Sequence, residues 1–84
     1  MTSGPVFCYI LECADSSYYT GWSTDLQRRL QEHNAGRGSR YTRSHRPVKL
    51  VYVEELPDRG AAMKREAAIK ALPRAKKEEL VRNT

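Results

Sequence analysis

The stretch YYTGWSTDLQRR, residues 18 to 29, predicts a strand that stops near a glycine and turns into a helix. Gly21 weakens the strand and lets another group approach its backbone closely. Thr24 and Gln27 have the spacing of a capping box, in which a threonine and a glutamine close the first turn of a helix. We therefore expect the chain to leave a hairpin and enter a helix at Thr24.

The helix is expected to run from residue 24 to 35 and to end at Gly36, because glycine commonly stops a helix. Two of the four residues on its inward stripe are not apolar, and the stripe consists of Leu26, Arg29, Leu30 and His33. Arg29 taken alone is usually a side chain that extends to water. His33 taken alone is more often structural than catalytic. Together, one helical turn apart, they are candidates for a functional site.

Together with the helix at residues 24 to 35, the sequence predicts three strands and three helices. We expect a buried strand in VFCYILEC (6–13), its hairpin partner in SYYTGW (17–22), a third strand in VKLVYVEEL (48–56), a helix from Asp58 to about Leu72 and a last helix whose first position is Pro73. The stripe expected to be buried in the helix after Asp58 consists of Ala62, Met63, Glu66 and Ile69. A carboxylate in an apolar stripe is a site candidate.

Length and charge limit the class of protein. A chain of 84 residues is long enough for one domain, here residues 1 to 84, and too short for two. Fifteen Lys and Arg against ten Asp and Glu give a formal charge of +5, which favours a polyanionic partner but also serves solubility. Four arginines with an aromatic residue among them recur at every third position of one segment: Arg37, Arg40, Arg43 and Arg46.

The cysteines and the N-terminal segment favour the cell interior. Cys8 and Cys13 are five positions apart in one expected strand, so their side chains point to opposite faces and cannot bridge. The N-terminal segment has no basic region before its short apolar run, and no run of 18 apolar residues occurs. We therefore expect a cytoplasmic protein. The motifs of phosphate-binding loops, cysteine and histidine metal sites and serine acyl transfer are absent from the sequence.

Four segments in order resemble the GIY-YIG nuclease family, in particular its small bacterial members that contain little else. They are FCY (7–9), YTG (19–21), RRLQEHNAG (28–36) and REAAIK (65–70), and the match extends from about Val6 to Val81. Two positions depart from the family pattern. Phe7 replaces the usual glycine, and the family's late asparagine has only Asn83 as its nearest counterpart.

The resemblance implies an α/β fold, a three-stranded antiparallel sheet flanked by helices, and metal-dependent hydrolysis of nucleic-acid phosphodiester bonds. DNA is the expected polymer, and DNA repair or recombination the expected process. A single Mg²⁺ or Mn²⁺ would be held by the carboxylate of Glu66. The other expected roles are charge stabilisation by Arg29, proton removal by Tyr9 or Tyr19, orientation of the phenol or a proton shuttle by His33, a structural role at the site for Gly21, and backbone binding by Arg37, Arg40, Arg43 and Arg46.

Two alternatives stay open. The first is a nucleic-acid-binding module of the same fold that cuts slowly or not at all. The second is a subunit whose site is completed only by a protein partner or by a second copy of the chain.

Overall fold

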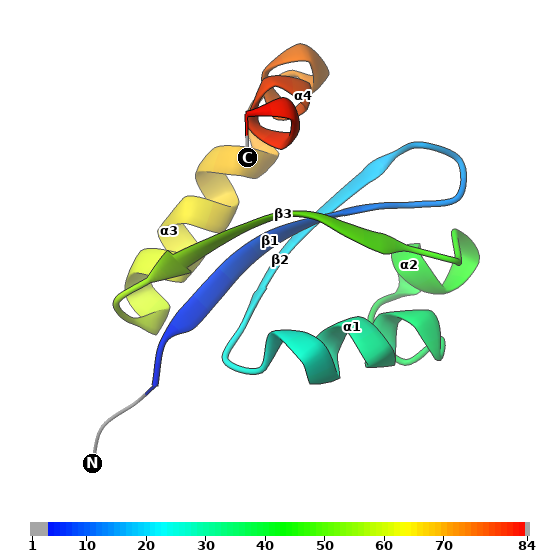
Figure 1. Cartoon of the computed structure of the whole chain (residues 1–84), viewed down its shortest axis with the longest axis horizontal. Coiled ribbons are helices and arrows are strands. Elements are labelled where there is room, and N and C mark those ends of the chain that lie inside the picture. The colour runs from blue at the N-terminus through cyan, green and yellow to red at the C-terminus, as the bar shows by residue number, and fades with distance from the viewer. Residues whose placement is uncertain (1–3, 84) are drawn as a thin grey trace.

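The chain forms a three-stranded antiparallel sheet with helices on both faces, as the α/β prediction requires (Figure 1). This computed structural model describes residues 4–83, whereas residues 1–3 and 84 of the expected domain lie outside the described residues. Its elements are β1 (Val6–Glu12), β2 (Tyr18–Ser23), α1 (Leu26–Asn34), α2 (Arg40–Ser44), β3 (Lys49–Leu56), α3 (Arg59–Lys70) and α4 (Arg74–Arg82).

The sheet has the order β2-β1-β3, with β1 antiparallel to both neighbours. This central position explains why β1 is a continuous apolar run, since both of its faces are covered. Tyr9 lies opposite Gly21 on β2 and opposite Val53 on β3. The register with β3 shifts between Ile10 and Leu11.

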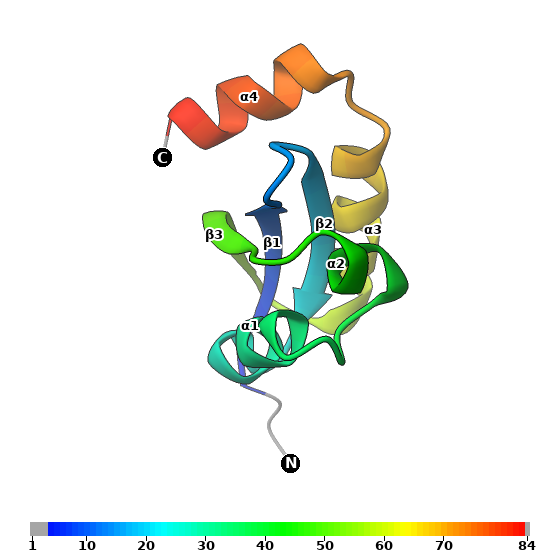
Figure 2. The same cartoon turned by 90° about the vertical axis from the view of Figure 1, so that its right-hand side faces the viewer.

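The helices divide between the two faces of the sheet, with α1 and α2 on one side and α3 and α4 on the other (Figure 2). Each face has its own apolar cluster, and Cys13 belongs to the first while Cys8 belongs to the second. Both cysteines are buried and unpaired with each other, as expected. The first cluster contains Tyr9, Leu11, Cys13 and Val48 with Tyr19, Leu26, Leu30 and Leu50 against it, and the second contains Cys8, Ile10 and Ile69 with Tyr18, Val51, Tyr52, Leu56, Leu80 and Val81 against it.

The start of α1 differs from the prediction. Its N-cap is Asp25, whose carboxylate accepts a hydrogen bond from the Arg28 main-chain N–H at 3.2 Å, so the capping box expected from Thr24 does not form. Ser23 accounts for the shift, because its hydroxyl accepts from the main-chain N–H of Asp25 at 3.0 Å and holds the turn one residue further on. The predicted stop is confirmed, since Gly36 has a φ of +84°.

Three other details of the helices correct or refine the expectations. Met63 is 55% exposed and not buried, because α3 faces the sheet with Ala62 and Ile69, each 0% exposed. Pro73 is the N-cap of α4 and not its first residue. The short helix α2 was not expected at all, although Asp58 does cap α3 as predicted. None of the helices in the described part of the chain has the length and apolarity needed to cross a membrane.

Candidate functional site

Three of the five predicted site residues meet on the α1 face of the sheet. Tyr9 stands in the middle of β1, His33 lies in the last turn of α1, and both are almost completely buried. The Tyr9 hydroxyl and His33 Nε2 are 3.0 Å apart, within hydrogen-bond distance. The ring of the half-buried Tyr19 packs edge-on against the His33 ring, with centroids 5.2 Å apart. A buried phenol is thus held by a buried imidazole.

Gly21 provides the space for this phenol. A Cβ on Gly21 would lie 2.7 Å from the Tyr9 hydroxyl oxygen, 2.9 Å from Tyr9 Cζ and 3.3 Å from Tyr19 Cε2. No larger residue fits there without displacing Tyr9. The close approach expected from the sequence is confirmed, and the approaching group is the phenol of Tyr9.

Arg29 lies one turn before His33, partly buried, with its guanidinium fixed at two points. One nitrogen donates to the main-chain carbonyl of Gly38 at 2.9 Å, and another donates to the Glu32 carboxylate at 3.0 Å. The positive charge of Arg29 also acts on Tyr9. Gly38 and Glu32 therefore hold the Arg29 guanidinium in place, and its charge acts on the phenol.

The electrostatic environment of Tyr9 and His33 keeps both uncharged near pH 7. Burial raises the pKa of Tyr9 to about 12, although the nearby Arg29 opposes part of this rise. Burial, followed by the positive charge of Arg29, lowers the pKa of His33 to about 4. The free protein thus holds a neutral phenol against a neutral imidazole.

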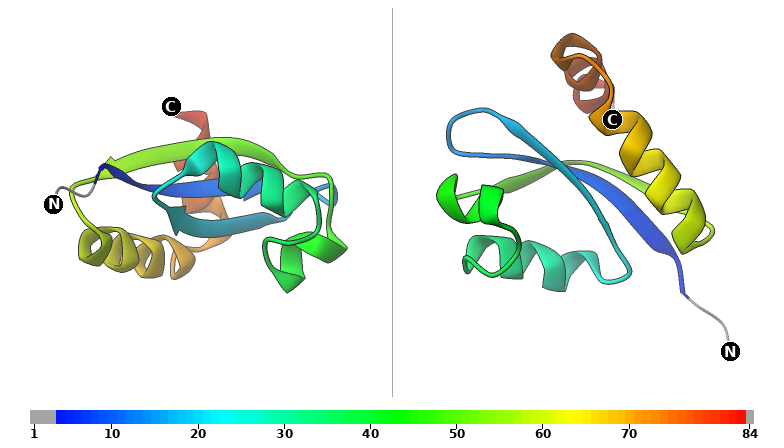
Figure 3. Two further views of the ribbon diagram at one scale, coloured as in Figure 1. Left: turned by 90° about the horizontal axis from the view of Figure 1, so that it is seen from below. Right: turned by 180° about the vertical axis from the view of Figure 1, so that it is seen from behind.

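Glu66 comes from α3, on the other face of the sheet. Its side chain is 23% exposed and lies 3.3 Å from Lys70 Nζ, so it does not extend into open solvent. Its charge contributes to raising the pKa values of both Tyr9 and Cys8, which places the carboxylate within electrostatic reach of the phenol. In Figure 3, α3 and α2 both lie toward β2, the edge strand that carries Gly21.

The donor set at Glu66 suits a hard cation that keeps most of its water. No group of three His, Cys, Asp or Glu in residues 4–83 could hold a metal ion by protein ligands alone. Mg²⁺ is commonly bound through one or two carboxylates together with waters and substrate phosphate oxygens. The single carboxylate fits an ion of that kind and does not fit a closed structural site.

The predicted basic segment divides into two parts. Arg37, Arg40 and Arg43 form no ion pair within the described residues, and they line a hollow of about 280 Å³ together with Gly36, Gly38 and Ser39. Arg46 instead donates to the main-chain carbonyl of Arg43 at 3.1 Å and to that of Asn34 at 3.4 Å. Arg37, Arg40 and Arg43 are thus available to a polyanion, whereas Arg46 connects α1 to α2 by hydrogen bonds.

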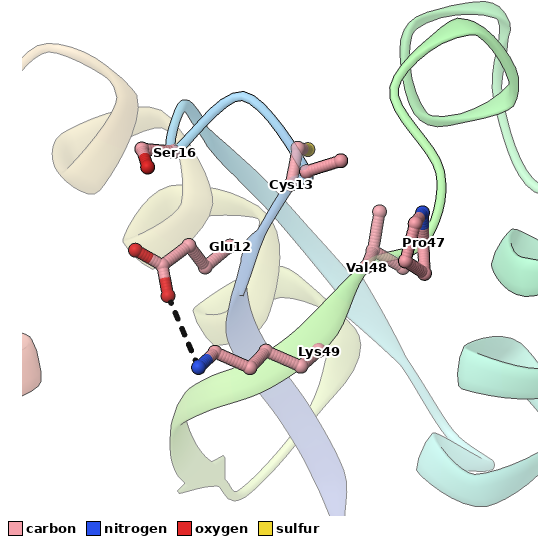
Figure 4. A pocket seen from close by; sticks show the side chains of 7 residues that line it. Glu12, Cys13, Ser16, Pro47, Val48 and Lys49 are labelled. Carbon is pink, nitrogen blue, oxygen red and sulfur yellow. Dashed lines mark ion pairs between the residues drawn. The ribbon is translucent and has the colours of Figure 1, made fainter.

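Two other features of residues 4–83 lie apart from this site. A hollow of about 300 Å³ between the end of β1 and the start of β3 contains the ion pair of Glu12 and Lys49, 3.5 Å apart, and none of the five predicted residues lines it (Figure 4). Asn83 is exposed at the end of α4, which packs against β3, and no hydrogen bond in the described residues joins its side chain to the site.

The structure adds residues that the sequence did not indicate. Thr42 is completely buried, and its hydroxyl oxygen is 2.8 Å from His33 Nδ1. Gly38 packs on the same ring edge and accepts from Arg29. The sequence offered one hint of this helix, which is the N-cap spacing of Ser39 and Thr42. That spacing alone is a weak predictor of a helix of only five residues.

Comparison with known proteins adds family and fold. The protein-family model described as the GIY-YIG catalytic domain matches residues 5–79 of the chain. A UPF0213 protein of Natronomonas pharaonis is 52% identical over 75 residues, which cover 89% of this chain and 88% of that protein. A UPF0213 protein of Syntrophus aciditrophicus is 49% identical over 77 residues, covering 90% and 88%. The solution structure of a UPF0213 protein from Bacillus halodurans has a TM-score of 0.62 at 44% identity and covers 95% of this chain and 85% of that one.

Proposed function

Because the chain belongs to the GIY-YIG catalytic domain family, we propose that it is a metal-dependent endonuclease that hydrolyses nucleic-acid phosphodiester bonds. DNA is the proposed polymer, and repair or recombination the proposed process. The observation that carries the proposal is the Tyr9 hydroxyl, 3.0 Å from His33 Nε2 and under the charge of Arg29. A phenol that meets a proton acceptor and lies within the influence of a positive charge is better able to lose its proton.

The proposed roles follow from these contacts. Tyr9 transfers its proton to His33 Nε2, and the resulting phenolate takes a proton from the attacking water. Arg29, held by Gly38 and Glu32, stabilises the phenolate and the charge that develops on the phosphate. Tyr19 packs against the imidazole and is the other phenol that stands near the reacting groups.

Glu66 is the proposed ligand of a single Mg²⁺ or Mn²⁺. A divalent cation bound there would supply positive charge that favours the ionised phenol and polarises the phosphate. In the free protein, the raised pKa of Tyr9 and the lowered pKa of His33 oppose proton transfer between them. Arg37, Arg40 and Arg43 would hold the nucleic-acid backbone without reading bases.

The test is a nicking assay on duplex, branched and single-stranded DNA, with and without Mg²⁺ or Mn²⁺. Glu66→Gln keeps the size of the side chain but removes the charge that a hard cation requires, so cleavage should fall by orders of magnitude. Affinity for DNA measured without metal should hold or rise, because a negative charge has been removed. The matched control is Glu79→Gln on α4, whose carboxylate is 51% exposed and pairs with Lys76, and it should cut like wild type. Metal-dependent cutting that survives Glu66→Gln would refute the assignment of Glu66.

A second function is favoured by the burial of Tyr9, whose side chain is only 1% exposed and whose pKa is about 12. Such a phenol is a poor base until its surroundings change, so a module that binds nucleic acid with little or no cleavage is the alternative. The binding-module alternative would be favoured if the wild-type protein bound every substrate tested and cut none. Cutting that appears only with an added protein or at concentrations where the chain dimerises would indicate a subunit that needs a partner.

A further inference from the structure

The side chain of Thr42 is fully buried beside His33, and the proposed reaction does not use it. Its hydroxyl oxygen lies 2.8 Å from His33 Nδ1, 2.9 Å from the Ser39 hydroxyl and 3.3 Å from the Ser39 main-chain carbonyl. A threonine hydroxyl has one hydrogen to donate and two lone pairs with which to accept. All three contacts are satisfied when it donates to the carbonyl and accepts from both Ser39 and His33.

Gly38 closes the remaining space around Nδ1. A Cβ built on Gly38 would overlap Nδ1 and Cγ of the His33 ring and lie 2.8 Å from the His33 Cα. The main chain of the loop therefore lies directly on this edge of the imidazole and leaves no room for another partner. Thr42 is the hydrogen-bond partner that the structure gives to Nδ1.

The contact of Nε2 with Tyr9, on the other side of the imidazole, also indicates that the ring hydrogen is on Nδ1. Arg29, whose positive charge acts on Tyr9, carries only donors and cannot take the hydrogen of the phenol. The hydrogen of the Tyr9 hydroxyl still needs an acceptor, and Nε2 at 3.0 Å is the one recorded in the described residues. Nε2 must then be unprotonated, and in a neutral imidazole the hydrogen is on Nδ1.

We propose that Thr42 is a positioning residue that fixes the tautomer of His33, by accepting the Nδ1 hydrogen and leaving the Nε2 lone pair directed at the Tyr9 hydroxyl. The tautomer itself does not depend on the proposed function, whereas its effect on turnover does. When Tyr9 gives up its proton, the phenol O–H bond breaks and an Nε2–H bond forms. The phenolate then carries one negative charge and the imidazolium one positive charge. Nδ1 keeps its hydrogen on Thr42 throughout, so the ring need not turn.

The direct test is the ¹⁵N spectrum of the His33 side chain in the full chain near pH 7, recorded with long-range couplings to the ring hydrogens. Wild type should show a protonated Nδ1 and an unprotonated Nε2. Thr42→Val keeps the shape but removes the acceptor, so the population should shift toward the Nε2–H form. Thr42→Ser keeps the hydroxyl and should restore the wild-type pattern. Thr20→Val makes the same change at a threonine that is 4% exposed and follows Tyr19 on β2, and it should leave the pattern unchanged.

The kinetic arm tests the consequence for turnover. Thr42→Val should lower kcat for DNA cleavage about five- to tenfold, with KM nearly unchanged, because one neutral hydrogen bond to a reacting group is lost. Thr42→Ser should recover most of this loss. A rise in KM without a fall in kcat would contradict a role in positioning His33.

Two results would overturn the assignment: an Nε2–H tautomer in wild type, or an unchanged tautomer in folded Thr42→Val. The wild-type spectrum is decisive even if the valine variant fails to fold. If wild type cuts no substrate, the proposed function fails while the spectrum still decides the tautomer, so the two failures can be told apart.

Discussion

At the scale of single residues, two glycines determine which polar groups meet. Gly21 allows the Tyr9 phenol to cross β2, and Gly38 brings the main chain of the loop against His33 while its carbonyl holds Arg29. Because these contacts exclude water, the phenol and the imidazole lie in an environment that disfavours charge on either. The same burial has a consequence for stability.

His33 should make the free energy of unfolding depend on pH. Its pKa is about 4 in the folded chain and about 6.5 when unfolded, so the unfolded state binds more protons and stability falls as the pH is lowered. Between about pH 7 and pH 5.5 the expected loss is about 1 kcal/mol. The groups facing the ring are Tyr9, Tyr19, Arg29 and Glu32. In this window Tyr9 and Arg29, whose pKa values are raised, keep their charge states, and Glu32, whose pKa is lowered, stays ionised.

Urea unfolding at the two pH values measures this loss. His33→Gln should abolish most of it, whereas His45→Gln, which changes the other histidine of the chain, should keep it. A wild-type free energy that does not change over this window would show that His33 is protonated as readily in the folded chain as in the unfolded one.

At the scale of elements, α2 and the loop before it connect the exposed arginines of residues 37 to 43 to the buried pair of Tyr9 and His33. Asn34 closes this segment, since its side-chain amide donates to the Val48 carbonyl at 3.0 Å and accepts from the Val48 N–H at 2.8 Å. Inside the closed segment, Thr42 faces inward to His33 while Arg40 and Arg43 face solvent. One short helix therefore serves both a support role and a proposed binding role.

The arginines of this segment should separate into two groups on mutation. Arg40→Ala with Arg43→Ala should weaken DNA binding similarly on unrelated sequences and reduce the salt slope by about 0.9 for each lost phosphate contact. Arg46→Ala should instead lower the free energy of unfolding by about 1 kcal/mol, because it removes two bonds to main-chain carbonyls. Binding titrations at several salt concentrations and thermal unfolding of each variant provide the measurements. An unchanged slope in the double variant would mean that Arg40 and Arg43 are only a solvated face.

At the scale of the whole molecule, β1 joins two apolar clusters that lie on opposite faces of the sheet. Leu11 belongs to the cluster under α1 and Ile10 to the cluster under α3 and α4. Since each cluster uses alternate side chains of the same strand, neither can form without fixing the strand that the other needs. The domain should therefore unfold as one unit.

Leu11→Ala and Ile69→Ala test this cooperativity from the two faces. Both side chains are at most 1% exposed, so each truncation should cost about 2–5 kcal/mol. Unfolding followed by fluorescence of Trp22 and by circular dichroism of the helices should give coincident curves in both variants. Met63→Ala, at a side chain 55% exposed on α3, is the control and should change stability by less than about 0.5 kcal/mol. Separate transitions would show that the two faces unfold independently.

The sequence predicted what periodicity and local chemistry determine. The central strand, the hairpin and the Asp58 cap follow from apolar runs and capping residues, and Gly21 follows from its strand position. Exposure of Met63 was not predictable, because it depends on how α3 is rotated against the sheet. The Asp25 cap depends on a hydroxyl two residues earlier, and the Thr42 contact on a turn that brings together residues nine apart. Contacts that depend on tertiary geometry produce no periodic pattern in the sequence, so they could not be predicted from it.

The placement of β1 between β2 and β3 also determines when the site can exist during synthesis. A chain emerging from the ribosome presents Tyr9 early, but the middle strand is paired on both sides only after β3, residues Lys49–Leu56, has followed. Glu66 arrives later still, on the other face. A nascent chain, or a proteolytic fragment that ends before α3, therefore carries the tyrosines, Arg29 and His33 without Glu66. The proposed nuclease would stay inert until the domain is almost complete, which spares nearby nucleic acid from unregulated cutting by unfinished or degraded copies.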